Sequence, residues 1–219
     1  MMHFADGQVP REYIGYVHFK IGFMCLAFIG LALGLAFSIS IGAAGVPFSD
    51  VVKTLVGISV SKRFDIIVWN IRMPQALTAV VAGAGLSVAG ATMQSILRNP
   101  LGSPFTLGIS QAAAFGAAFS VMILGSGVMQ STNLGSVSIS NPYLTTITAY
   151  GLSMLAAGVI IAISKVRGTT PEVMVLTGVA LGALFTAGTM LLQYFADDVQ
   201  LAAMVFWTFG DIARASWSD

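Results

Sequence analysis

Charged residues are scarce in this chain. Only 9% of its 219 residues are Asp, Glu, Lys or Arg, whereas 56% are hydrophobic and the mean hydropathy is +0.87. A soluble globular domain carries about 25% charged residues, so the composition excludes an ordinary soluble domain and indicates an integral membrane protein. The formal net charge is +1, which leaves neither a basic surface for nucleic acid nor an acidic disordered tail.

Metal-binding and catalytic residue types are equally scarce. Cys25 is the single cysteine, and His3 and His18 are the two histidines, so we expect neither an internal disulfide nor a cysteine or histidine metal cluster. The sequence has no glycine-rich loop ending in Gly-Lys-Ser or Gly-Lys-Thr, which excludes ATP binding through a P-loop. We therefore expect no enzyme active site, no metal and no cofactor in this chain, and an energy source on a partner.

Long charge-free runs, by contrast, are abundant. A helix needs about 20 apolar residues to cross a bilayer. Five runs meet this need and are predicted membrane spans: 21–41, 75–97, 105–129, 143–164 and 173–195. A further apolar run at 200–210 is too short to cross alone. The predicted fold class is all-α, a polytopic bundle of transmembrane helices, and residues 1–219 are treated as one integral membrane domain.

The first run has a second interpretation. Arg11 and Lys20 precede it and small residues follow it, as in a cleavable secretory signal. It is longer than the apolar core of most such signals, so we treat it as a span. The positive-inside rule does not settle orientation, because a cytoplasmic amino terminus would divide the basic residues equally. Those inside would be Arg11, Lys20, Arg98, Lys165 and Arg167, and those outside Lys53, Lys62, Arg63, Arg72 and Arg214.

Small residues recur at four-residue spacing in three of the runs. This spacing places them on one face of a helix, where they let neighbouring backbones approach. The three ladders are Ala79, Gly83, Ser87, Ala91 and Ser95; Gly108, Ala112, Gly116 and Ser120; and Gly178, Gly182 and Thr186. A single ladder is typical of ordinary helix packing, whereas three in one chain indicate a compact bundle. No charged residue lies within a run, which argues against a proton-driven carrier.

One part of the sequence carries distinctive residues at fixed spacing. A span opens with Arg72 and Pro74, closes with Met93 and Gln94, and leads into RNPLGSPFTLGIS at 98–110. This arrangement resembles the permease subunits of ABC importers for iron-siderophores, haem and cobalamin. The stretches VLTGVALGALFTAG and FWTFGDIARASW resemble that family's fifth span and the segment after it. The resemblance covers most of residues 66–217.

The resemblance implies a permease of ten spans that works as a dimer of identical or closely related chains in the cell membrane. Its amino terminus would be cytoplasmic, and the helix at 200–210 would lie at the outer face. Cytoplasmic ATPase subunits would bind ATP, and an extracytoplasmic binding protein would deliver an iron chelate or cobalamin. Apart from membrane lipid, no other partner is implied, and no nucleic acid. Since about five of the ten spans are present, we expect part of a longer or split protein, or a truncated one.

The resemblance also assigns roles to residues. Arg72 matches the first arginine of an Arg-x-Pro-Arg element that, in the cobalamin permease, grips acidic residues of the binding protein, whereas Gln75 replaces the second. Arg72 is therefore the candidate docking residue, with Lys62 and Arg63 able to replace the lost charge; alternatively, Arg72 reaches toward lipid headgroups. The other candidates are a cytoplasmic corner near the ATPase, namely Arg98, Asn99, Pro100, Leu101 and Pro104, and pathway-lining positions Thr177, Gly178, Gly182 and Thr186.

The corner at 98–104 is predicted to end one helix and begin the next. Proline disfavours helix in the residue before it, and Pro104 suits the first turn of a helix. We expect this corner to be a structural hinge that does not touch substrate. Two other functions remain open: half of a secondary carrier built from repeats, and a membrane scaffold without transport. The corner is not repeated within this chain, which weakens the carrier hypothesis.

Overall fold

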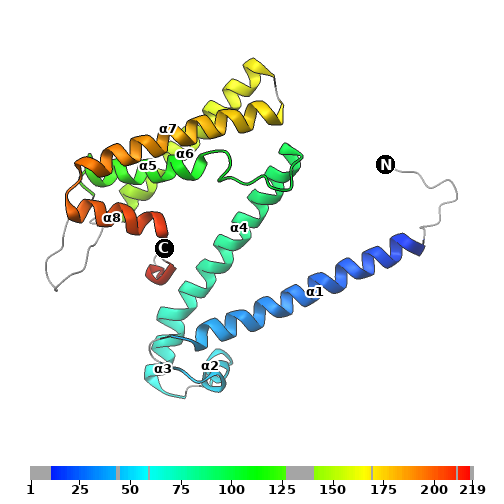
Figure 1. Ribbon diagram of the computed structural model, residues 1–219. Helices are drawn as coiled ribbons and strands as arrows, with labels where there is room; N and C mark the ends of the chain where they lie inside the picture. The colour runs from blue at the N-terminus through cyan, green and yellow to red at the C-terminus, as the bar shows by residue number, and fades with distance from the viewer. Residues whose placement is uncertain are drawn as a thin grey trace. The chain divides into compact units, whose positions relative to one another are not determined.

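The structure, a computed structural model, describes residues 11–42, 45–58, 60–126, 141–168, 170–210 and 212–217. Every regular element in these ranges is helical, which confirms the all-α prediction. The chain divides into two compact units. One comprises Met1–Val80 with Ala213–Asp219, and the other comprises Val81–Ile212. Figure 1 shows the helices of both units.

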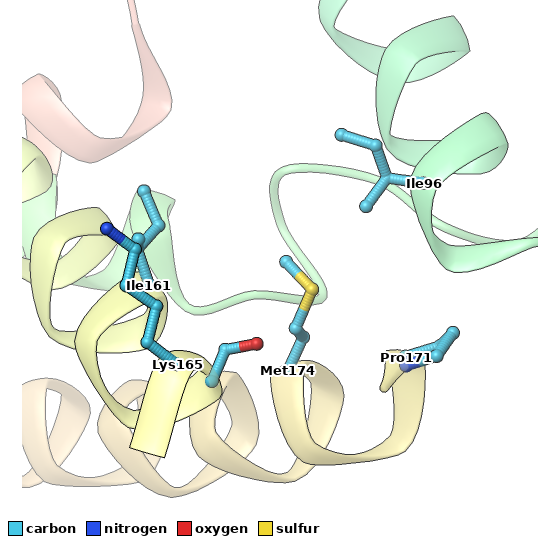
Figure 2. Close-up of a pocket in the computed structure, with 6 residues that line it drawn as sticks. Ile96, Ile161, Lys165, Pro171 and Met174 are labelled. Carbon is cyan, nitrogen blue, oxygen red and sulfur yellow. The ribbon is translucent and has the colours of Figure 1, made fainter. Parts of the chain in front are cut away.

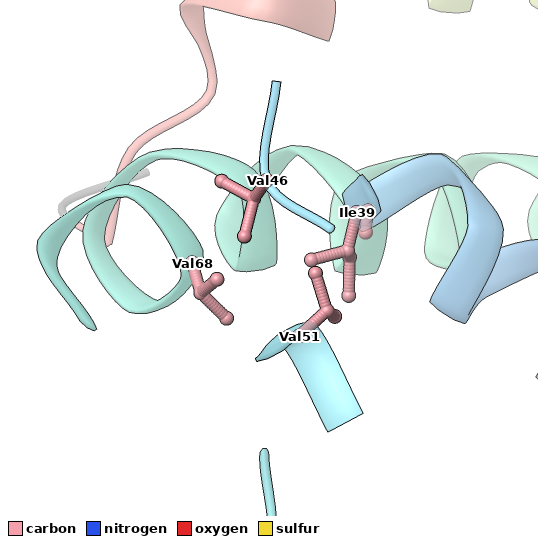
Figure 3. Packing of buried hydrophobic residues seen from close by; sticks show 5 residues of the cluster. Ile39, Val46, Val51 and Val68 are labelled. Atoms are coloured by element: carbon pink, nitrogen blue, oxygen red, sulfur yellow. The ribbon is translucent and has the colours of Figure 1, made fainter. Parts of the chain in front are cut away.

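The first unit is built around the carboxyl end of α1 (Arg11–Ser40). The short helices α2 (Phe48–Leu55) and α3 (Lys62–Ile66) follow it. Most side chains of α1 are exposed, and its buried contacts lie in the last turns. Figure 3 shows the small apolar core of this unit, where buried side chains from α1, α2 and the following segments meet. The core consists of Ile39, Val46, Val51, Val68 and Ala76.

The second predicted span belongs to a longer helical stretch, Lys62–Leu97. Between α3 and α4 (Met73–Leu97), residues Ile67–Arg72 form a π-helical segment, in which the Met73 N–H donates to the Val68 carbonyl. Pro74 accounts for this segment, because a proline lacks an N–H and its ring collides with the carbonyl four residues earlier in an α-helix. A wider π turn relieves that collision. The helix therefore begins well before the predicted residue 75.

The second unit contains α5 (Ile109–Met122), α6 (Pro142–Arg167), α7 (Pro171–Phe195) and α8 (Asp198–Phe209). Helix α5 packs against both α6 and α7, and α8 contacts α5 and α7 (Figure 1).

Local sequence sets three of the helix starts. The side chains of Asn141, Thr170 and Asp197 each accept from the backbone N–H three residues later, as N-caps do. Proline also stands in the first turn of α6 and α7.

Helix α5 is shorter than the predicted span 105–129. It begins at Ile109 and ends at Met122, and residues 127–129 lie outside the described residues. Its 14 residues extend roughly 21 Å, less than the ~30 Å of a hydrocarbon core. Residues 103–108 form consecutive turns, so Pro104 does not occupy the first turn of a helix, contrary to the prediction. Among the described residues, four helices and not five are long and apolar enough to cross a membrane.

Small and hydroxyl-bearing residues hold α5 and α6 together. A Cβ built on Gly116 of α5 would lie 2.7 Å from the Cα of Ala149 on α6, so the two backbones are in direct contact. At the end of this contact, three buried hydroxyls bond to one another. Ser126 Oγ lies 2.9 Å from the oxygens of both Ser120 and Thr145. The ladder on α5 therefore packs as predicted, whereas the ladder on α4 is exposed.

Candidate functional site

The predicted docking residue, Arg72, is only 8% exposed. Its Nη1 donates to the backbone carbonyls of Ile39 and Ser40, the second at 2.8 Å. These carbonyls belong to the last turn of α1, where backbone acceptors lack helical donors and where a positive charge is favourable. The guanidinium therefore caps α1. These contacts give Arg72 a structural role, and its docking role stays a prediction.

Gly42 leaves the space that the Arg72 guanidinium occupies. A Cβ at position 42 would lie 2.7 Å from Nη2 of Arg72. No specific signal in the sequence points to this pairing, because Gly42 is one of several small residues at the end of the first apolar run. Since the capped carbonyls and Gly42 are adjacent in the chain, a single guanidinium holds the end of α1 and the segment after it.

Gln75, which stands where the family pattern has a second arginine, also makes a structural contact. Its Nε2 donates to the Ala213 carbonyl at 2.7 Å. Close by in the chain, the Trp217 indole N–H donates to the Trp69 carbonyl at 2.7 Å. Ala213 and Trp217, which belong to the first unit, thus lie against the beginning of the long helical stretch. A glutamine suffices for this bond, because a carbonyl requires a donor and not a charge.

The exposed basic side chains nearest to Arg72 in the sequence are Lys62 and Arg63, in the first turn of α3. Both were predicted as replacements for the missing second arginine. Unlike Arg72, they are accessible to a partner. In the described part of the chain, no group of three His, Cys, Asp or Glu side chains is placed to hold a metal ion.

The corner between α4 and α5 is stabilised by its own side chains. Asn99 Oδ1 accepts from the Leu101 N–H at 2.9 Å, and Gln94 Nε2 donates to the Pro100 carbonyl at 2.8 Å. Arg98 adopts a φ of 47°, an uncommon conformation for a residue other than glycine. Leu101 is 81% exposed. The polar residues of the corner therefore shape the turn, while Arg98 and Leu101 remain available for contacts.

Two of the predicted pathway-lining residues lie at a backbone contact. Gly178 and Gly182 are buried on the face of α7 that meets Leu107 and Gly108. A Cβ on Gly178 would lie 2.6 Å from the Cα of Leu107, which leaves no space for a substrate. Thr177 is half-buried and Thr186 is exposed. Of the four candidates, Gly178 and Gly182 are therefore buried in helix packing, whereas the side chains of Thr177 and Thr186 are at least partly exposed.

One family of transport proteins matches most of this chain. The FecCD transport family matches residues 30–219. The chain belongs to this FecCD family. Together with four long apolar helices in the described residues, this membership identifies a multi-pass membrane protein and confirms the resemblance found in the sequence.

Two relatives and one solved structure show the extent of the similarity. A protein of Methanocaldococcus jannaschii assigned as an ABC transporter permease is 47% identical over 212 residues, covering 97% of this chain and 60% of its own. The hemin transport system permease protein of Yersinia pestis is 32% identical over 206 residues, covering 90% and 54%. An inward-facing structure assigned to a metal-chelate type ABC transporter is 25% identical, with a TM-score of 0.69 over 91% of this chain and 56% of the other.

The FecCD chain thus spans between about half and three fifths of the length of these proteins. The family is a transport family and both relatives are permease proteins, in agreement with the interpretation of the sequence. Two contacts were not predicted from the sequence: the pairing of Gly42 with Arg72, and the approach of Gly108 to α7. The small-residue ladders contained the signal for the second of these, because Gly108, Gly178 and Gly182 all belong to them.

Proposed function

We propose that this FecCD chain contributes to the permease of an ABC importer that carries an iron chelate, haem or cobalamin across the cell membrane. The observation that carries the proposal is the family match over residues 30–219. It is supported by the hemin permease of Yersinia pestis and by the structural similarity to a metal-chelate type transporter. A metal complex of this kind is too polar and too large to cross a bilayer unaided, so a protein path is required.

Energy for transport would come from cytoplasmic ATPase subunits, because the sequence lacks a P-loop of its own. An extracytoplasmic binding protein would deliver the cargo. ATP-driven closure of the ATPase pair would then shift the permease between outward-facing and inward-facing states, since a ligand that binds one state more tightly shifts the population toward it. The corner at 98–104, with exposed Arg98 and Leu101, is the proposed cytoplasmic region near the ATPase.

Basic residues of the second unit support a cytoplasmic position for this corner. Arg98, Lys165 and Arg167 lie at the ends of α4 and α6 that meet the start of α7, whereas Asp197 and Asp198 lie beyond the opposite end of α7. Lysine and arginine are enriched in cytoplasmic loops. The basic residues of the whole chain divide equally between the two sides, but those of the second unit gather at one end. We propose that this end is cytoplasmic and that the amino terminus of the chain is cytoplasmic as well.

The proposed path runs along an interface between two permease copies. Helix α7 presents an exposed stripe at helical spacing that would suit such a surface: Val179, Ala183, Thr186 and Met190. Thr186 is the pathway candidate that this stripe supports. Thr177 lies on nearly the opposite side of α7, because it precedes Val179 by two residues in a helix of 3.6 residues per turn. Because Gly178 and Gly182 pack against the turns before α5, their proposed contribution is to position α7 and not to touch cargo.

Association with an ATPase tests the function most directly. We expect the full-length permease to retain its ATPase subunits through purification in mild detergent, and to stimulate chelate uptake into vesicles when ATP and the binding protein are both present. Uptake would be measured with radioactive iron chelate or cobalamin. A well-folded permease that retains no ATPase, or uptake that persists without ATP, would contradict the importer mechanism.

Reversal of the exposed charges on α3 tests docking. We expect the double substitution of Lys62→Glu and Arg63→Glu to slow association of the binding protein by roughly three- to tenfold at low salt, because rim charges act chiefly on the association rate. The effect should shrink as salt rises. Surface plasmon resonance at several salt concentrations would measure it. Arg72→Glu should also weaken docking at low salt, but together with a lower melting temperature, because Arg72 is buried against α1. Equal docking by all variants would exclude this surface.

A further inference from the structure

A groove opens in the second unit where three helices end. Side chains from the carboxyl ends of α4 and α6 and from the start of α7 surround it, with Ile96 facing Ile161 across Met174 (Figure 2). The lining residues are Ile96, Ile161, Ser164, Lys165, Pro171 and Met174, and the volume is about 270 Å³. This lies below the usual range of small-molecule pockets, about 300–1,000 Å³. The groove is therefore unsuited to a whole metal chelate.

Ser164 gives the groove an unsatisfied polar group. The residue is only 4% exposed, it lines the groove, and its hydroxyl forms no hydrogen bond within the described residues. Other helical hydroxyls in this chain bond to the carbonyl four residues earlier, as Thr92, Ser153 and Thr189 do. Buried polar groups in native proteins are nearly always hydrogen-bonded. The Ser164 hydroxyl opens onto the groove and is therefore free to donate to an occupant.

Positive charge surrounds the same end of the unit. Lys165 lines the groove, and Arg98 and Arg167 stand close to it in the chain. All three are exposed, and within the described ranges none of them forms an ion pair. The acidic residue at this end, Glu172, does not line the groove and hydrogen-bonds to Thr170. Lys165 is therefore the charged side chain that lines the groove, and it has no ion-pair partner among the described residues.

The remaining lining is apolar. Ile96, Ile161 and Met174 present aliphatic side chains along the groove, and the groove lies at the ends of long apolar helices, where a membrane would place lipid headgroups. A soluble anion would pair with Lys165 but would leave the apolar side chains of the groove exposed to water. An amphipathic anion satisfies both. Lysine stems also pack well along apolar surface while the ammonium stays at the headgroup level.

We propose that this groove binds an anionic phospholipid. The phosphate lies against the Lys165 ammonium and accepts a hydrogen bond from the Ser164 hydroxyl, and one acyl chain runs along Ile96, Ile161 and Met174. Negative lipids attract basic residues at a membrane surface, and the groove converts that general attraction into a defined site. The proposal is independent of the transported cargo and of the ATPase.

The test uses the protein purified from membranes, stripped of lipid and titrated with phosphatidylglycerol or phosphatidylcholine, with bound lipid counted by native mass spectrometry. We expect tighter binding of phosphatidylglycerol by roughly fivefold, the preference that one basic residue confers at a surface. Lys165→Gln should abolish this preference, and Met174→Trp should block the site by filling the groove. Ser164→Ala should weaken binding without disturbing packing.

Arg167→Gln is the matched control, because it removes the same charge from the same helix end outside the groove. It should leave phosphatidylglycerol binding intact. Equal losses in Lys165→Gln and Arg167→Gln would overturn the proposal in favour of diffuse surface attraction. Unchanged binding in both Ser164→Ala and a folded Met174→Trp would also overturn it. Inorganic phosphate at millimolar concentration should not displace the lipid, and displacement would show that the site takes a free anion.

Discussion

Replacing Gly108 with alanine should strongly destabilise the second unit. Gly108 has a φ of 71°, and a Cβ there would lie 2.5 Å from the Gly178 carbonyl oxygen and 2.8 Å from the Gly182 nitrogen. The left-handed conformation costs roughly 1–2 kcal/mol for other residues, and overpacking adds about 1–3 kcal/mol. We expect Gly108→Ala to lower the free energy of unfolding by about 2–5 kcal/mol, measured by unfolding in denaturing detergent.

Gly125 provides a control that separates the two contributions. Its φ of 69° is nearly the same, but a Cβ there would meet nothing within 4 Å. Gly125→Ala should therefore cost only the conformational part, roughly 1–2 kcal/mol. Two variants of equal stability would show that α7 does not approach the turn before α5 as closely as the structure indicates.

Removal of the Arg72 guanidinium should loosen the end of α1. Arg72→Met keeps much of the side-chain volume but deletes the donors to the Ile39 and Ser40 carbonyls. A hydrogen bond to a charged group contributes about 1.5–3 kcal/mol in protein mutational series. Both carbonyls accept from one nitrogen, Nη1, so together they contribute little more than one such bond. We expect a loss of about 1.5–3 kcal/mol and a clearly lower melting temperature, measured by thermal unfolding followed by size-exclusion chromatography.

Arg63→Met is the comparison for this variant, because Arg63 is exposed and belongs to the same unit. It removes an equal charge and should leave the melting temperature nearly unchanged, as surface substitutions usually do. If Arg72→Met were fully stable yet unable to associate with the binding protein, Arg72 would be a docking residue, and the capping role inferred from its contacts would be wrong.

Local signals explain why some helices were predictable from sequence. Helices α6 and α7 begin at Pro142 and Pro171, within two residues of the predicted 143 and 173, because a capping residue and a proline mark each start. The start of α5 carries no such mark. It depends on Gly108 meeting α7 about 70 residues later in the chain, and a contact of that range leaves no trace in a hydropathy pattern.

The same limit applies to the candidate site. The motif containing Arg72, Pro74 and the 98–104 corner was sufficient to identify the family, but the motif gave no information on the surroundings of Arg72. Its partners lie 33 and 32 residues earlier, and both are backbone carbonyls, which any residue would provide. The lipid groove is likewise invisible in sequence, because Ile96, Lys165 and Met174 come from three different helices.

The capping of α1 by Arg72 sets an order of events during biosynthesis. As the chain is synthesised from its amino terminus, α1 is complete at Ser40, but the guanidinium that closes its last turn belongs to a residue added 32 positions later. Until then α1 has only the water or lipid around it to satisfy those carbonyls. The carboxyl end of α1 is therefore completed only after the following hydrophobic stretch has been synthesised as far as Arg72.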